Sequence, residues 1–451
     1  MDTLEYEKKS RNSLIEICKH KKISGYSSKT KEAIIKMILD KDATKEIIYK
    51  DYIKTNDAPC AISLFSGAGG DTLGMKNSGY NVIAFSEKDK SAIKTHLSAF
   101  PESVHIINSQ TNDCDIKNLP NEAFSVYRNK LNVVFAGFPC QGFSNAGKKN
   151  SQDPRNELVY EFARVVDVTK PKWFIGENVP GLLSRTGKDP ITLNERPVID
   201  IIRDIFFRIG YNIIYKLLKA TDYGVPQERK RLIIIGTPIE NGIPEFPENE
   251  KNYKNENKNE KNYENENENE NLECTIGLKN ILESHLEHAM VFPKENIPQN
   301  LSAHYWINTE ETLPTGIPHP NLVRLVTGIK NLPKKEQNGE NKSTTVEGGL
   351  ISFGVRKSPY HGQILDPLLP SKTIISTYNL CPRLFVGLYN VKTDTYWIRC
   401  LSIRELGQIQ GFPKDYPWEG NISQVITQIG NAVPPPIITS VINSLSKIKF
   451  S

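Results

Sequence analysis

A short apolar run that leads into a cysteine-bearing loop constrains the fold of this chain most. Residues 133–136 read VVFA, which is typical of a buried strand, and the loop GFPCQGFS follows at 137–144. Gly137 and Pro139 end the strand, so we expect Cys140 just past its carboxyl end. Ligands and catalytic groups gather at that edge of open α/β sheets. Because a lone free cysteine is more often core filler than a nucleophile, the neighbouring segments must decide between these interpretations.

Three further apolar runs end in residues that suit the same sheet edge. Residues 61–65 lead into the turn SGAGGD, 81–85 lead into Ser86-Glu87, and 173–176 lead into Glu177-Asn178. A strand, a glycine-rich turn and a helix let the backbone approach a nucleotide-like ligand, and an acid at the end of the second strand can accept hydrogen bonds from ribose hydroxyls. The pattern predicts an α/β fold with a Rossmann-like sheet.

These motifs resemble, in order, those of the cytosine-5 methyltransferases. The nucleophile of that family lies in a Pro-Cys-Gln loop, as at 139–141 here, and a Glu-Asn-Val motif follows, as at 177–179. Further matches are the Gln-x-Arg-x-Arg pattern at 227–231, RELGQIQGFP at 404–413 and Asn-Ala-Val-Pro at 431–434. Several ordered motifs make chance agreement negligible. The resemblance covers residues 60–236 and 396–446 and implies a class I methyltransferase fold.

The resemblance also implies a role for each matching residue. Cys140 would be the nucleophile, Glu177 the acid or hydrogen-bond donor at N3 of the cytosine, and Arg229 the residue that holds the base. The cofactor would be S-adenosylmethionine, bound by Phe65, Gly67, Gly69, Gly70, Glu87, Asp115, Pro139, Leu158, Asn431 and Val433. The expected substrate-binding residues are Gln141, Gly142, Phe143, Ser144, Asn178, Gln227 and Arg231, with Arg231 facing the phosphates or the sheet.

Two of these assignments have an alternative. Asp113 competes with Asp115 for the adenine, because Cys114 stands where the family has a glycine. Leu158 is explained equally well by core packing. No metal site is expected, since the seven cysteines contain no C-x-x-C pair.

Composition and motifs divide the chain into four parts. Residues 1–57 contain two predicted amphipathic helices, within 10–42, and a linker; residues 1–54 carry 13 Lys/Arg and 9 Asp/Glu, a net +4 of the chain's +5. This part resembles a SAP-type DNA-binding module, and a solvated lysine-rich hairpin is an equally good interpretation. Residues 58–237 would form the catalytic domain, 238–395 a smaller target-recognition domain, and 396–451 a return to the catalytic domain. Residues 248–271, rich in Asn, Glu and Lys, are predicted to be a disordered insertion.

The expected function is methyl transfer from S-adenosylmethionine to C5 of a cytosine flipped out of a specific double-stranded DNA sequence, through a covalent Cys140–C6 intermediate. The family implies a bacterial restriction–modification setting, a monomer, and a cognate endonuclease that acts independently on the same site. Two alternatives stay open: a tRNA cytosine-5 methyltransferase, in which a proline would typically replace Phe138, and a catalytically inactive DNA-binding relative.

No apolar run approaches the roughly 20 residues that span a bilayer, and the N-terminus lacks a signal-peptide core, so we expect a cytoplasmic protein without a membrane partner.

Overall fold

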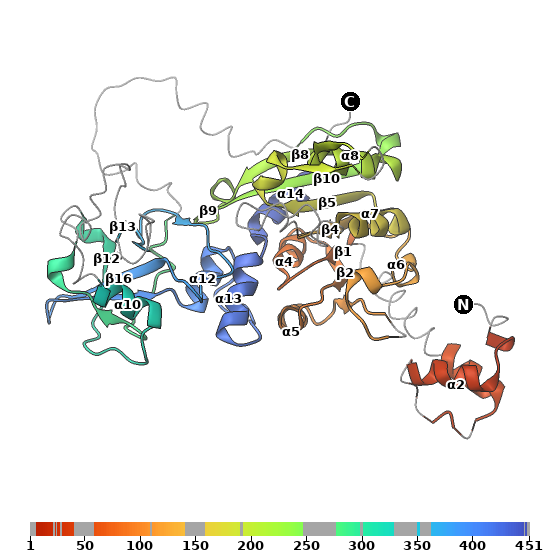
Figure 1. Ribbon diagram of the computed structural model, residues 1–451, viewed down its shortest axis with the longest axis horizontal. Coiled ribbons are helices and arrows are strands. Elements are labelled where there is room, and N and C mark those ends of the chain that lie inside the picture. Colours follow the sequence, from red (N-terminus) through yellow and green to blue (C-terminus); the bar gives the residue numbers. More distant parts are fainter. Residues whose placement is uncertain are drawn as a thin grey trace.

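The computed structural model describes residues 6–20, 23, 25–27, 29–39, 58–108, 111–139, 158–189, 193–246, 277–297, 301–328, 350–351, 362–445 and 447–448. Figure 1 shows a large α/β part in the middle, a smaller part on a second sheet, and a small helical module near the N-terminus. Cys140 and residues 141–144 lie outside the described ranges, as does the predicted insertion at 248–271.

The large part is built on a seven-stranded sheet in the order β3-β2-β1-β4-β5-β10-β8. Its parallel strands are β1 (Cys60–Leu64), β2 (Asn81–Ser86), β3 (Val104–His105), β4 (Val133–Ala136) and β5 (Trp173–Asn178). Strand β10 (Lys230–Pro238) pairs antiparallel with both β5 and β8 (Tyr211–Lys219). The strand order reverses between β1 and β4, so the carboxyl ends of these strands flank the crevice in which such sheets bind ligands. The predicted α/β fold with a parallel-rich central sheet is confirmed.

The central sheet has a hydrophobic core on each face, because successive side chains of a strand point to opposite sides. Ile62 and Val134 enter the core covered by α6 (Glu122–Ser125), α7 (Leu158–Thr169) and α8 (Val198–Arg208). Ala61 and Val133 enter the core covered by α4 (Gly70–Asn77) and α14 (Pro435–Leu445). The last long helix of the chain therefore packs beside the helix that follows the glycine-rich turn.

The smaller part contains a sheet in the order β11-β17-β16-β14-β13, with β12 beside β16. Its strands are β11 (Met290–Val291), β12 (Trp306–Asn308), β13 (Leu350–Ile351), β14 (Gly362–Ile364), β16 (Leu384–Asn390) and β17 (Thr395–Cys400). Its helices are α10 (Pro320–Gly328), α12 (Ile403–Ile409) and α13 (Ile422–Asn431). Strand β15 (Ser371–Lys372) pairs with β9 (Gln227–Glu228), which immediately precedes β10, and so ties the smaller part to the larger one.

The described residues also form further helices, 3-10 turns and short strands. They are α5 (Lys90–Ala99), η1 (Ile116–Asn118), η4 (Pro180–Ser184), β6 (Thr186–Lys188), β7 (Glu195–Pro197), η5 (Ala220–Tyr223), η6 (Ile239–Asn241), η7 (Lys294–Asn296) and η8 (Ala303–Tyr305).

The N-terminal module consists of α2 (Arg11–His20) and a second helical segment at 31–39. The two helices bury a core of their own around Leu14, Cys18, Ile34 and Ile38. Arg11 donates hydrogen bonds to the carbonyl oxygens of Ser27 and Lys29 and so fastens the segment between the helices to the first helix.

Within the described residues, the stretch Ile422–Leu445 is long and apolar enough to cross a membrane by length and composition alone. Residues 432–434 interrupt it, and 72% of the most apolar window is buried inside the protein. We therefore assign this stretch, which forms α13 and α14, to the protein core.

Candidate active site

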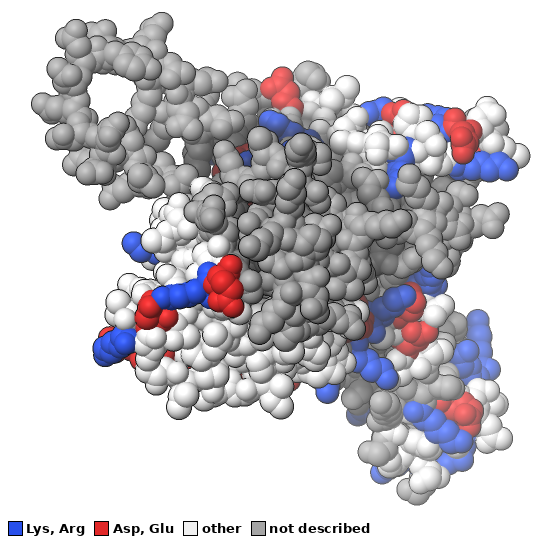
Figure 2. All heavy atoms as spheres, turned by 60° about the vertical axis from the view of Figure 1, so that its left-hand side comes forward, with Lys and Arg blue, Asp and Glu red and all other residues white. Residues whose placement is uncertain are grey.

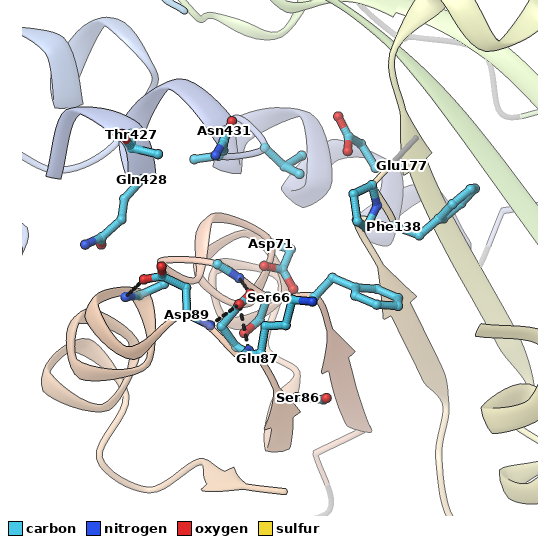
Figure 3. Close-up of a pocket in the computed structure, with 18 of the residues that line it drawn as sticks. Ser66, Asp71, Ser86, Glu87, Asp89, Phe138, Glu177, Thr427, Gln428 and Asn431 are labelled. Carbon is cyan, nitrogen blue, oxygen red and sulfur yellow. Dashed lines mark hydrogen bonds between the residues drawn. The ribbon is translucent and has the colours of Figure 1, made fainter. Parts of the chain in front are cut away.

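A cavity of about 490 Å³ lies at the carboxyl ends of β1, β2, β4 and β5. Figure 3 shows Glu87 and Asp89 on one wall and Thr427, Gln428 and Asn431 of α13 across from them. This volume falls within the range of about 300–1,000 Å³ that is usual for small-molecule sites. The cavity is lined from all four strand ends at which the sequence predicts binding or catalytic residues.

The glycine-rich turn after β1 shapes the cavity in two ways. Phe65 and Gly67 line it, and both have left-handed backbones with φ of 55° and 52°. Gly69 and Gly70 do not line it: a side chain at Gly69 would meet the ring of Phe100, and one at Gly70 would collide with the carbonyl group of Val433. The latter two glycines thus act through close packing and not through the cavity wall.

Glu87 is held at the end of β2 by backbone N–H groups. Its Oε2 accepts a hydrogen bond from the N–H of Gly67 at 2.8 Å, and its Oε1 accepts from the N–H groups of Lys88 and Asp89 at 2.7 and 2.8 Å. The carboxylate is therefore fixed in orientation, and Oε2, which accepts a single hydrogen bond, keeps acceptor capacity for a ligand. This arrangement suits the hydroxyl groups of a sugar.

Asp115 extends the same wall beyond Glu87. It caps η1 by accepting from the N–H of Lys117 and pairs with Lys88 Nζ at 3.1 Å. The alternative residue, Asp113, does not line the cavity; it accepts hydrogen bonds from Asp115 N–H and from the Asn118 side chain. Of the other predicted cofactor residues, Leu158, Asn431 and Val433 also line the cavity.

The chain just before Cys140 forms the opposite end of the cavity. Phe138 and Pro139 line it, and Asn178 of β5 donates a hydrogen bond to the Phe138 carbonyl oxygen at 3.0 Å. The Asn178 Oδ1 accepts from the N–H of Val179 at 2.8 Å. Asn178 therefore holds the backbone that leads into the cysteine loop.

Glu177 and Arg231 form an ion pair at this end. Glu177 Oε1 lies 2.6 Å from Arg231 Nε, and both residues line the cavity. Burial raises the pKa of Glu177, whereas Arg231 and Arg229 lower it. The result is a carboxyl group whose pKa lies above its usual value and that is oriented by a guanidinium group.

The structure places Arg229 and Gln227 away from the cavity, unlike the prediction, whereas Arg231 lines it. Arg229 is 1% exposed and does not line the cavity; it donates to the carbonyl oxygens of Ile374, Gly430 and Ala432 at 2.9–3.1 Å. Gln227 is also buried, and its side-chain NH₂ donates to Gln410 Oε1 at 2.6 Å. Side chains 227, 229 and 231 alternate in the sequence and would share one face of a single continuous strand. They do not share one here, because the chain leaves β9 at residue 228 and enters β10 at residue 230.

The cavity wall also contains residues that the motifs did not indicate. They are Ser66, Asp71, Ser86, Asp89, Ser423, Gln424, Thr427 and Gln428. Asp71 directly follows the glycine pair, which is a usable signal, whereas the α13 residues carry none because they reach the cavity only through the packing of distant segments. Among the described residues, the buried Ser66 hydroxyl has no hydrogen-bond partner.

Comparisons with known proteins identify the family. The model of the "C-5 cytosine-specific DNA methylase" family matches residues 60–447, which include both sheets. The type II methyltransferase M1.HphI of Haemophilus parahaemolyticus is 30% identical over 401 residues, which cover 86% of each chain. The type II methyltransferase M.DdeI of Desulfomicrobium norvegicum is 27% identical over 405 residues, which cover 85% of this chain and 88% of the relative. The chain belongs to the C-5 cytosine-specific DNA methylase family and is a cytosine-5 methyltransferase that uses S-adenosylmethionine.

Proposed function

We propose that this enzyme methylates C5 of a cytosine rotated out of a specific double-stranded DNA sequence, through a transient bond between Cys140 and C6. The observation that carries the proposal is that one cavity contains both Glu87 and the Glu177–Arg231 pair, with Pro139 on its wall. Cys140 follows Pro139 directly in the sequence. A methyl donor and an acceptor base must meet in one space, and this cavity offers a polar wall for each.

The cavity residues fit S-adenosylmethionine. Glu87 would hold the ribose hydroxyls, Asp115 would lie toward the adenine, and the unpartnered Ser66 hydroxyl would bind a polar group of the cofactor. Phe65 and Leu158 supply apolar wall for the nucleoside. When bound, the cofactor supplies a methyl group on a positively charged sulfur, which makes that methyl electrophilic.

The cytosine must be activated because its C5 is a poor nucleophile. The Cys140 thiolate would form a bond to C6, which turns C5 into the nucleophilic carbon of an enamine. After C5 has taken the methyl group, loss of the C5 proton restores the double bond and breaks the S–C6 bond. A model cysteine has a pKa of about 8.5, so only a few per cent is thiolate near neutrality without help from the loop.

We assign the acid at N3 to Glu177 and a base-holding role to Arg231 in place of Arg229. The raised pKa of Glu177 favours the protonated form, which can donate to N3 as the thiolate adds. Arg231 Nε orients this carboxyl group, Nη1 donates to the carbonyl oxygen of Lys230, and the other N–H groups can bind the base. Arg229 would be a positioning residue, since it fixes the backbone around Ala432 that borders the cavity.

Access to the base requires that the DNA be held and the cytosine rotated out, at a cost of a few kcal/mol. We assign sequence recognition to the smaller part and phosphate contacts to the N-terminal module. The described residues 6–39 contain seven Lys/Arg and three Glu, a net +4. Figure 2 shows blue side chains on this module at the lower right. We further propose a cytoplasmic monomer that protects DNA from a separate endonuclease.

The test is a methyl-transfer assay with labelled S-adenosylmethionine on duplex DNA and, in parallel, on tRNA. The proposal predicts label in DNA, and bisulfite sequencing of DNA from expressing cells should report one recurrent sequence around the modified cytosine. Label in tRNA alone would contradict the DNA assignment. No transfer to either, together with tight DNA binding, would indicate an inactive DNA-binding relative.

A further inference from the structure

Asp71 is a buried carboxyl group on the cavity wall that the mechanism above does not use. It lies in the first turn of α4, and only 2% of its surface is exposed. Its Oδ2 accepts a hydrogen bond from the hydroxyl group of Ser63 on β1. Within the part of the chain that the structure describes, no Lys, Arg or His forms an ion pair with it. A buried carboxylate without a cation is unfavourable, so a cationic ligand that binds next to Asp71 would be stabilised by this unpaired negative charge.

The position of Asp71 indicates which part of the cofactor it would meet. In Figure 3, Ser66 and Glu87 lie to one side of Asp71, and Phe138 and Glu177 lie to the other. Glu177 also raises the pKa of Asp71 electrostatically, as expected for two carboxyl groups on one cavity. The sulfur of S-adenosylmethionine joins the ribose to the methyl group that must reach the base. A bound donor would therefore place its positive sulfur between these two ends.

We propose that the Asp71 carboxylate faces the sulfonium of the cofactor and makes the cavity prefer S-adenosylmethionine over its product, S-adenosylhomocysteine. This inference rests on the proposed function, since it requires the donor to occupy the cavity with its methyl group directed at the base end. The product lacks the positive charge at sulfur but keeps the adenine, the ribose and the amino-acid tail. A charge at Asp71 would thus stabilise the donor alone, whereas Glu87 would stabilise both ligands.

The protonation of Asp71 makes this preference depend on pH. Burial raises its pKa to about 7, although hydrogen bonds from the Ser63 hydroxyl and from the backbone N–H groups of Asp71 and Thr72 lower it. Above pH 7 the carboxylate is charged and the preference is present. Below pH 7 it is protonated and the preference is lost.

Few other titratable groups act on Asp71. The elements packed against α4 are β1, β2 and α14. Helix α14 and strand β2 carry no charged residue, and Cys60 is the one titratable group of β1. The charge of Glu177 adds to the rise in the pKa of Asp71. The pKa of Tyr416 is raised by burial and, to a smaller extent, by Asp71, so Tyr416 stays neutral. The pH response of the preference should therefore follow Asp71 and Glu177.

The experiment measures the dissociation constants of both ligands by calorimetry on the full chain without DNA, at pH 6, 7 and 8. For the wild type, we expect the ratio of the product constant to the donor constant to rise about tenfold from pH 6 to pH 8, since one partly screened charge contact is worth roughly that factor. In Asp71→Asn the ratio should stay near its wild-type value at pH 6, with product affinity unchanged. Asp415→Asn, which removes an exposed carboxylate, is the matched control and should behave as the wild type.

A second variant keeps the test decisive if Asp71→Asn folds poorly. Ser63→Ala keeps the carboxylate but removes a hydrogen bond that lowers its pKa, so the rise in the ratio should move to higher pH. Equal weakening of both ligands in Asp71→Asn would overturn the proposal, because it would indicate a packing role or a contact with the ammonium group of the tail. A wild-type ratio independent of pH would overturn it as well. Binding of neither ligand would instead refute the cofactor site itself.

Discussion

The two ends of the cavity are built in different ways. At the nucleoside end, backbone N–H groups of Gly67, Lys88 and Asp89 hold the Glu87 carboxylate, and all of these groups come from two neighbouring strand–turn units. At the base end, the Glu177 carboxyl is held by the side chain of Arg231 from a different strand. The first end depends on local backbone geometry, and the second depends on a side-chain pair across the sheet. Binding and chemistry should therefore respond separately to substitution.

The largest expected effect is at the base end, at the nucleophile. Cys140→Ser should lower methyl transfer more than about 10⁴-fold, because the hydroxyl cannot replace the thiolate in the addition to C6. The affinity for S-adenosylmethionine should stay within about twofold, since the nucleoside end is intact. Labelled-methyl transfer and calorimetry measure the two effects. Normal turnover by this variant would remove Cys140 from the mechanism.

Glu177→Gln should lower kcat by about 10²–10⁴-fold, the usual contribution of a positioned acid. The amide can still accept a hydrogen bond from Arg231, but it is too weak an acid to transfer a proton to N3. Single-turnover kinetics on duplex DNA would measure the loss. A fall in cofactor affinity as large as the fall in rate would show that the two ends of the cavity are not separable.

Glu87→Gln should produce the converse result at the nucleoside end. Loss of charge-assisted hydrogen bonds worth about 1.5–3 kcal/mol should weaken the binding of S-adenosylmethionine by about 10- to 100-fold. The kcat at saturating cofactor should change little, because the base end is untouched. Calorimetry and steady-state kinetics test this split, and an unchanged dissociation constant would contradict the role of Glu87.

The smallest expected effect on chemistry comes from Arg229→Lys, which touches neither end directly. Lysine cannot donate to the carbonyl oxygens of Ile374, Gly430 and Ala432 together, so the variant should lose about 1–3 kcal/mol of stability. The unfolding temperature should fall while the turnover of the folded fraction stays within a few-fold. The matched variant, Arg231→Lys, should lower the turnover and leave the unfolding temperature nearly unchanged. Equal effects of the two substitutions on stability and on turnover would contradict the separate roles of Arg229 and Arg231.

The sequence predicts well those parts of the cavity that depend on a single strand and the turn after it. Each apolar run that forms β1, β2, β4 or β5 ends at a cavity-lining residue or directly before one, because the carboxyl ends of parallel strands share one edge of a sheet. The places of Arg229 and Gln227 could not be predicted, since they depend on the change of sheet between β9 and β10. The other cavity-lining residues of α13, at 423–428, could not be predicted either, because packing of segments far apart in the chain brings them to the cavity.

The most direct test of the central claim uses duplex DNA in which 5-fluorocytosine replaces cytosine. Fluorine at C5 cannot leave as a proton does, so the bond between Cys140 and C6 should persist after methyl transfer. We expect a covalent protein–DNA adduct that requires S-adenosylmethionine, survives denaturation, maps to Cys140 and is absent in Cys140→Ser. Methylation of ordinary DNA without any such adduct, or an adduct that persists in Cys140→Ser, would contradict it.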